Sequence, residues 1–183
     1  MRQNGIFMLA ASPTRSGRSG QGQRGFTLIE LLVTISIVAI LAALAVPAFD
    51  SVALSSKLNS LSSSFMASAQ LARSEAIKRN AQVTLCASSN GTGCTGAWKD
   101  GWVVLFGTTV IQSQAKFPNG FQMSDSLAGA TSIVFQPTGV GATHVNLTLC
   151  RATPTVGDQE RTITISTTGR PDVTRVSGAT TCP

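Results

Sequence analysis

The sequence has a single histidine, His144, and lacks short motifs that mark two common classes of enzyme. It contains no G-x-S-x-G motif or comparable arrangement of serine, aspartate and histidine, so we do not expect a hydrolase. It contains no Walker motif either, so any nucleotide-driven motor must be a separate protein. We therefore expect a protein that is not an enzyme and that uses no cofactor, and we assign no chemistry to His144.

Acidic residues are absent from residues 1–25, which contain four arginines: Arg2, Arg15, Arg18 and Arg24. These arginines supply most of the formal net charge of +6. The sequence pI near 9.8 therefore overstates how basic the rest of the chain is, and it supports nucleic-acid binding only weakly. Residues 1–25 are also rich in Ser, Gly and Gln, which is typical of a flexible leader. A start at Met8 instead of Met1 would leave the same chemistry.

A long apolar run, residues 26–46, follows this leader. Its polar side chains are those of Thr27, Glu30, Thr34 and Ser36. As a helix rising about 1.5 Å per residue, the run would match the hydrocarbon thickness of about 30 Å. Arginines directly before such a segment place that end in the cytoplasm by the positive-inside rule. The rest of the chain then lies across the membrane.

Glu30 decides between three interpretations of this run, because an acidic residue at mid-bilayer costs roughly 2.5–3.5 kcal/mol. A cleaved secretory signal, with an A-x-A site at residues 43–45, would have a shorter apolar core and no Glu30 inside it. An ordinary membrane anchor leaves Glu30 unexplained. Cleavage between Gly25 and Phe26 explains it, because the new α-amine would lie four residues from Glu30 and could form a charge pair, within one subunit or between neighbours.

The four cysteines all follow the apolar run: Cys86, Cys94, Cys150 and Cys182. An even number outside the cytoplasm predicts disulfides. A zinc site is the alternative, but the spacings contain no C-x₂-C pair and one histidine supplies no ligand cluster. Four cysteines allow three disulfide connectivities, and we favour the local one, Cys86–Cys94 with Cys150–Cys182.

Residues 47–80 continue as an amphipathic helix. Pro47 removes one backbone donor, so we expect a kink there. Lys78 and Arg79 favour a helix C-terminus, and Asn80 is suited to end it. One apolar stripe follows the 3.6-residue period. Its members are Leu54, Leu58, Leu61, Phe65, Ala69, Ala72 and Ala76.

Short runs rich in β-branched residues follow the helix and are separated by Gly, Pro, Asn and Asp, which predicts strands. They are QVTLCA (82–87), GWVVLF (101–106), TTVIQ (108–112), SIVFQ (132–136), VNLTLC (145–150), RTITIS (161–166) and DVTRV (172–176). A long helix followed by antiparallel strands predicts an α+β fold. Trp98 and Trp102 are expected to pack in the core or at strand ends rather than to form a binding surface.

The stretch RGFTLIELLVTISIVAILAALAVPAF, residues 24–49, resembles the class III signal of type IV prepilins and type II secretion pseudopilins. Gly25, Phe26 and Glu30 match the signal position by position, and Pro47 matches the proline that commonly kinks the pilin helix. The resemblance implies that a prepilin peptidase cleaves after Gly25 and methylates Phe26. It also implies assembly with other pilins or pseudopilins at an inner-membrane platform, with Glu30 as the assembly residue.

Four internal motifs resemble the GspH/FimT group of minor pilins and pseudopilins: ARSEAIKRNAQVTLC (72–86), CTGAWKDGWVVLF (94–106), IVFQPTG (133–139) and ISTTGRPDV (165–173). The resemblance implies a type IV pilin-like lollipop, with a long N-terminal helix, transmembrane in its first half, packed on antiparallel β-sheets. The expected organisation is a cytoplasmic leader (1–25), a transmembrane half-helix (26–46), an amphipathic half-helix (47–80) and a periplasmic β-rich domain (81–183). Membership of a pilus or of a secretion system stays open.

The segment TGRPDVTR raises an alternative function. DNA-binding FimT-like pilins of competent bacteria carry a Gly-Arg-x-Arg tail, and Gly169 and Arg170 match it. Asp172 stands where the second arginine is expected, and Arg175 follows three residues later. Arg151 and Arg161 would add charge, but nearby acids, Asp158 and Glu160, offset it. We favour a turn between terminal strands here, with DNA contact by Arg170 and Arg175 as the alternative.

Overall fold

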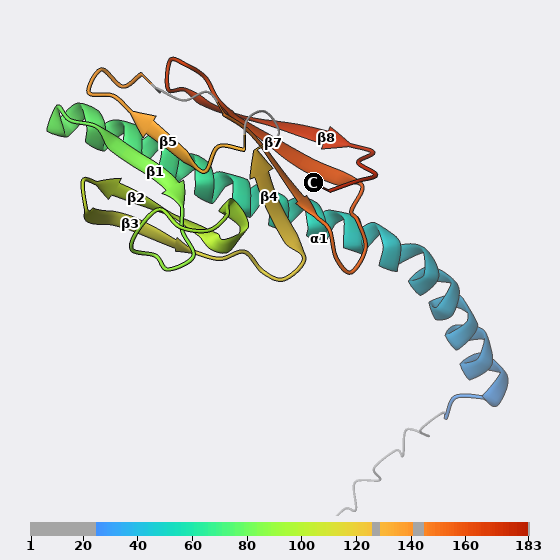
Figure 1. Ribbon diagram of the computed structural model, residues 1–183. Coiled ribbons are helices and arrows are strands. Elements are labelled where there is room, and N and C mark those ends of the chain that lie inside the picture. Colours follow the sequence, from blue (N-terminus) through green and yellow to red (C-terminus); the bar gives the residue numbers. More distant parts are fainter. Residues whose placement is uncertain (1–24, 126–128, 141–144, 183) are drawn as a thin grey trace, which may run out of the picture. The chain divides into compact units, whose positions relative to one another are not determined.

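The computed structural model describes residues 25–125, 129–140 and 145–182 (Figure 1). Residues 1–24 and His144 lie outside this description, as does the choice between Met1 and Met8. The chain divides into two compact units, one up to Ala42 and one from Ala43 onward. The described residues form one long helix, α1 (Leu28–Arg79), a short 3₁₀ helix, η1 (Trp98–Asp100), and eight strands.

The part of α1 in the first unit is a run of apolar side chains exposed on every side of the helix. Thr27 precedes the helix, and its hydroxyl accepts a hydrogen bond from the Glu30 amide at 3.3 Å. Thr34 and Ser36 turn their hydroxyls back to the backbone oxygens of Leu31 and Leu32, each at 2.8 Å. These bonds satisfy the hydroxyls within the helix, as an apolar environment requires. By length and composition, α1 is able to cross a membrane.

The second part of α1 packs on the strands through the predicted apolar stripe. Six of its members are buried: Leu54, Leu58, Phe65, Ala69, Ala72 and Ala76. The seventh, Leu61, is partly buried against the same core. The helix is continuous through position 47. The Pro47 side chain lies outside the description, so the kink there stays a prediction.

The helix ends at Arg79 for local reasons. Asn80 adopts a left-handed backbone conformation with φ 49°, which asparagine tolerates better than most residues. The Ala81 amide then donates to the Ala76 carbonyl at 3.2 Å, and the Asn80 amide donates to Ile77 at 3.2 Å. Lys78 and Arg79 occupy the last turn, where their positive charges oppose the negative end of the helix dipole.

The strands form two four-stranded antiparallel sheets. The first has the order β3-β2-β1-β5, and the second has the order β4-β6-β7-β8. The bounds are β1 (Val83–Ala87), β2 (Gly101–Phe106), β3 (Thr109–Ala115), β4 (Phe121–Asp125), β5 (Ser132–Phe135), β6 (Val145–Arg151), β7 (Gln159–Ile165) and β8 (Pro171–Ser177). Figure 1 shows both sheets beside the second part of α1. Because β8 is the last strand in the order of the second sheet, it is an edge strand.

The α+β fold with a long helix before antiparallel sheets agrees with the sequence prediction, but β4 was not predicted. Its sequence, FQMSD, has no β-branched residue. Gly120, directly before it, has φ +90°, and a Cβ there would collide with the Thr153 carbonyl oxygen. The Gly120 carbonyl accepts a hydrogen bond from Ala152 at 2.8 Å. Contacts with a segment some thirty residues away therefore fix the start of β4, and local sequence does not reveal them.

Trp98 and Trp102 pack in the core, 2% and 1% exposed. Phe65 from α1 contacts both indoles edge to face, with centroids 5.4 and 5.3 Å away. Each indole N–H has an acceptor: Trp98 donates to the Ala130 carbonyl at 2.7 Å and Trp102 to the Ser68 hydroxyl at 2.9 Å. This agrees with the expectation that the tryptophans are core residues.

Candidate functional site

The first candidate site is the start of α1, where Gly25, Phe26 and Glu30 lie. Phe26 is 83% exposed, and Glu30 is also exposed. The Thr27–Glu30 hydrogen bond places Glu30 at the third position of the helix, in a T-x-x-E arrangement typical of a helix start. A carboxylate there also favours the helix dipole. Glu30 thus has a local structural role while its oxygens stay accessible to an approaching cation.

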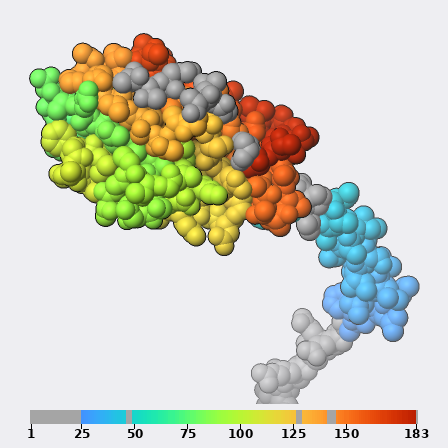
Figure 2. Space-filling model, in the orientation of Figure 1, coloured from blue at the N-terminus to red at the C-terminus, as the bar shows by residue number. Residues whose placement is uncertain are grey.

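The apolar surface behind this start is large. Leu28 is 76% exposed, and its neighbours along the helix are 48–66% exposed through Leu41: Ile29, Leu31, Leu32, Val33, Ile35, Ile37, Val38, Ile40 and Leu41. Soluble proteins rarely leave so many adjoining apolar side chains in water. Such a surface, part of which is blue in Figure 2, favours contact with lipid or with other apolar helices.

The cysteines form two disulfides, Cys86–Cys94 and Cys150–Cys182, the two pairs that the sequence favoured. The first closes the loop after β1, in which the Ser88 and Asn90 side chains hydrogen-bond to each other at 3.1 Å. The second ties the segment after β8 to β6. Among the residues that the structure describes, no group of three or more His, Cys, Asp or Glu is arranged to hold a metal ion.

The two arginines proposed to contact DNA lie at opposite ends of the edge strand. Arg170 precedes β8 and borders a depression beside Arg73 and Ile77 of α1. Arg175 lies five residues further on, beside Ser51 and Ser55, which is roughly 16 Å along an extended strand. Asp172 and Arg175 have opposite parity on β8, so their side chains point to opposite faces of the sheet. Asp172 therefore does not lie between the two arginines on one face of the sheet.

Arg161, which was expected to add exposed charge near the tail, is instead buried, with 2% of its surface exposed. Its guanidinium lies between β7 and α1 and donates to Asn59 Oδ1 at 2.9 Å, to the Ser55 hydroxyl at 3.0 Å and to the Glu160 carbonyl at 2.9 Å. All these acceptors are neutral. Burial lowers the pKa of the Arg161 guanidinium, and the positive charge of Arg175 lowers it further.

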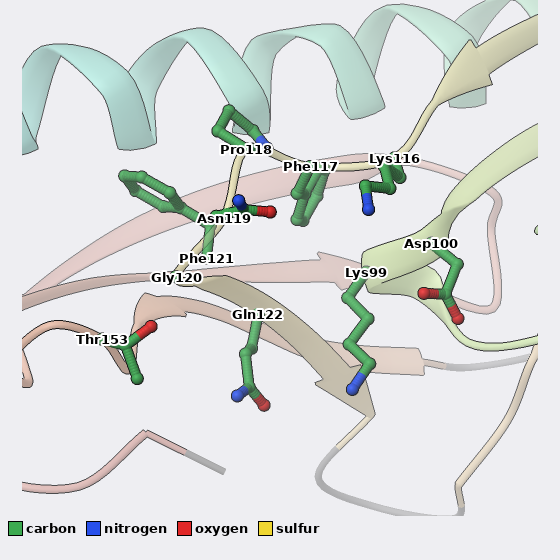
Figure 3. Close-up of a pocket in the computed structure, with 10 residues that line it drawn as sticks. All are labelled: Lys99, Asp100, Lys116, Phe117, Pro118, Asn119, Gly120, Phe121, Gln122 and Thr153. Atoms are coloured by element: carbon green, nitrogen blue, oxygen red, sulfur yellow. The ribbon is translucent and has the colours of Figure 1, made fainter.

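A separate depression of about 200 Å³ lies where η1, the β3–β4 connection and β4 meet (Figure 3). Lys99, Lys116 and Asp100 line it, together with Phe117, which packs edge to face on Trp102 at 5.7 Å. The ten residues drawn in Figure 3 include no histidine or cysteine and only one carboxylate. We assign no chemistry to this depression.

The fold defines the class of protein. A long N-terminal helix followed by antiparallel sheets is the type IV pilin fold, and crystal structures of the type IV minor pilin FimU from Pseudomonas aeruginosa (strain PAO1) have it too. One FimU structure is 19% identical, with a TM-score of 0.52, and the match covers 64% of this chain and 92% of FimU. A second crystal form is 18% identical, with the same TM-score, and covers 65% and 89%.

Family models identify the group more closely. The model described as "Type II transport protein GspH" matches residues 61–169, which is more than half of the chain. The model described as "Prokaryotic N-terminal methylation motif" matches residues 20–46. No curated protein shows significant sequence similarity to the chain. The chain belongs to the GspH/FimT family of minor pilins and pseudopilins.

Proposed function

We propose that this chain is a structural minor pilin or pseudopilin that enters a type IV pilus or a type II secretion pseudopilus. It is inserted in the inner membrane with its N-terminus in the cytoplasm. Prepilin peptidase removes residues 1–25 and methylates Phe26. Residues 26–46 then leave the bilayer for a filament of other pilins at the inner-membrane assembly platform. The β-rich domain, residues 81–183, lies in the periplasm, and the protein catalyses no reaction.

One observation supports this proposal: a helical segment of exposed apolar side chains has, in its first turn, an exposed carboxylate four residues after Phe26. Once the leader is removed, the Phe26 nitrogen becomes a cation. Glu30 of the same or a neighbouring subunit is the only acid within residues 25–49 that it can pair with. In a low-dielectric environment such a pair is strong and specific in position. Glu30 would thus fix the position of one subunit relative to its neighbour.

The processing step is tested by mass spectrometry of protein purified from a host that carries prepilin peptidase. We expect a mature chain that begins with N-methylated Phe26. Glycine before the cut offers no side chain to obstruct the peptidase, so Gly25→Val should leave the leader attached. A mature chain that begins at Val46 would instead identify a secretory signal and exclude the pilin proposal.

DNA uptake is a second candidate, supported by two exposed arginines at an edge strand: Arg170 directly before β8 and Arg175 within it. Two phosphate contacts predict a log K against log[salt] slope of about −2 on duplex DNA. We therefore expect weak, sequence-independent binding at most. A mobility shift of labelled duplex by the full mature chain, at low and moderate salt, separates this role from the structural one. Loss of the shift in an Arg170→Ala, Arg175→Ala double variant would support DNA contact.

The neighbouring genes would distinguish a pilus from a secretion system.

A further inference from the structure

A depression of about 370 Å³ lies between α1 and the edge of the second sheet, apart from the start of α1. Residues of three elements line it: Ser51, Val52, Ser55, Ser56 and Asn59 from α1, Gln159 from β7 and Arg175 from β8. Its polar side chains are hydroxyls, amides and one guanidinium. All of them lie in the second compact unit.

The guanidinium of Arg175 lines this depression, and a second arginine, Arg161, lies opposite it on the neighbouring strand. Arg161 and Arg175 are directly opposite each other on β7 and β8, so their side chains leave the same face of the sheet. Arg161 does not itself line the depression, but it is buried and bonded to two residues that do, Ser55 and Asn59. Arg175 is exposed, and within the described chain only Gln159 Oε1, at 3.0 Å, accepts a hydrogen bond from it. A guanidinium has five N–H donors, so Arg175 keeps donors for another partner.

Neither guanidinium has an acidic partner among the residues that the structure describes. Within the described residues, the ion pairs closer than 4.0 Å are those of Glu75 with Lys78 and Arg79, at the far end of the helix. Glu160 is next to Arg161 in sequence, but strand alternation directs its side chain to the opposite face. A buried charge without a counter-charge is costly, and a second positive charge beside it adds to the cost.

We propose that this depression receives an acidic side chain of a neighbouring pilin or pseudopilin subunit. The carboxylate binds the free donors of Arg175, and the Ser55, Ser56 and Gln159 side chains surround it. It also neutralises part of the Arg161 charge. An Arg–carboxylate contact of this kind is both strong and directional.

A subunit is the partner that the position of the site favours. The lining residues Ser51–Asn59 belong to the same continuous helix whose apolar start, on the proposed function, enters the filament. A neighbour that packs along α1 therefore reaches the depression without any separate docking surface. The inference rests on the proposed assembly role, and it adds a second, polar contact to the one at Glu30.

The test uses the full-length chain in inner membranes of a host that makes its partner pilins. A photo-crosslinker at Ser56, which lines the depression and is exposed, should give adducts with another pilin. Arg175→Glu should reduce these adducts and pilin co-purification about tenfold or more, because like charges would then face each other. Arg175→Lys should retain part of the yield. Replacement of buried Arg161 risks misfolding, so Arg175 is the residue to change.

Arg170→Glu is the matched control, since it makes the same charge change beside the same strand but away from this depression. It should leave the Ser56 adducts unchanged. Equal losses in both variants, or none in Arg175→Glu, would overturn the proposal. If Arg175→Glu loses binding to anionic vesicles or to duplex DNA while co-purification stays intact, the occupant is a phosphate and the proposal is overturned.

If Glu30→Val abolishes co-purification and Arg175→Glu does not, the depression proposal fails while the assembly function stands. If even the unmodified chain captures no pilin, both fail.

Discussion

The two parts of α1 form one continuous helix but differ in the burial of their apolar side chains. In the first part, Leu28 is 76% exposed and Ile37 is 52% exposed. In the second, Leu58 and Phe65 are fully buried against the sheets. The first part is apolar on all sides, whereas the second confines its apolar residues to one stripe and fills its other faces largely with serine. Among the residues that the structure describes, the apolar stripe of the second part is buried, and the apolar side chains of the first part are exposed.

This contrast separates two tasks within one helix. Within α1, the second part supplies the contribution to the free energy of folding, because its apolar stripe is removed from water by packing on the sheets. The first part contributes almost nothing to that free energy, and its apolar surface is available to lipid or to other subunits. Variants in the two parts should therefore affect different measurements.

The largest expected effect is loss of assembly in Glu30→Val. The valine removes the carboxylate that we propose to pair with the Phe26 α-amine, and it also removes an insertion cost, so the chain should still enter the membrane and be processed. We expect no co-purification with partner pilins and an unchanged midpoint of urea unfolding. Glu30→Asp, which keeps the charge, is the control. Normal assembly of the valine variant would show that Glu30 is dispensable.

Phe65→Ala tests the second part of the helix, where a change should affect the stability of the domain. Removing a fully buried phenyl ring leaves a cavity between Trp98 and Trp102, and such changes cost about 3–5 kcal/mol. Urea unfolding of the full chain in detergent, followed by tryptophan fluorescence, measures this loss directly because both indoles contact Phe65. Ile37→Ala is the matched control and should change the free energy of unfolding by less than about 0.5 kcal/mol. Similar losses in both variants would contradict the division of the helix.

Much of the fold follows from local patterns. The 4-3 spacing from Leu54 to Ala76 predicts which face of α1 is buried, because burial must follow the helical period. The β-branched runs predict seven of the strands, although β3 extends to Ala115 and β7 begins at Gln159, beyond the predicted limits. Strand β4 escapes prediction because its pairing with β6, rather than its own residues, makes it a strand.

The two candidate sites also differ in how far the sequence reveals them. The signal at Gly25, Phe26 and Glu30 is contiguous in sequence, so a motif reveals it. The depression beneath α1 joins helix residues to β7 and β8, about a hundred positions away, so no motif describes it. One signal was present nonetheless. In RTITIS, Arg161 has the same parity as Ile163 and Ile165 and therefore faces the core. An arginine that alternates in step with the core-facing residues of a strand is expected to be buried.

The difference between the two disulfides is a smaller expected effect, and it lies within the domain. The chain-entropy model predicts about 3.7 kcal/mol for Cys150–Cys182, which are 32 residues apart, and about 2.5 kcal/mol for Cys86–Cys94, which are 8 apart. Each pair contains one buried cysteine, so packing losses are similar in the two double alanine variants. Urea midpoints should fall further for the longer loop, while membrane insertion and processing stay normal. Non-reducing peptide mapping should recover the same two pairs, and crossed pairs would contradict the strand arrangement.

The smallest expected effect lies at the end of α1, where Glu75 pairs with Arg79 at 2.6 Å and Lys78 at 3.6 Å. The hydrogen bond from Arg79 lowers the pKa of the Glu75 carboxyl below its ordinary value. A carboxyl with a lowered folded-state pKa contributes stability above its unfolded pKa, about 4.3, and loses it as the pH falls through the folded value. Glu75→Gln should therefore lower the urea midpoint slightly at pH 7, and the difference should shrink below about pH 4. A pH-independent difference would mean that glutamine disturbs packing rather than charge. The same substitution should leave assembly unchanged, because this end of the helix belongs to the part that stabilises the domain.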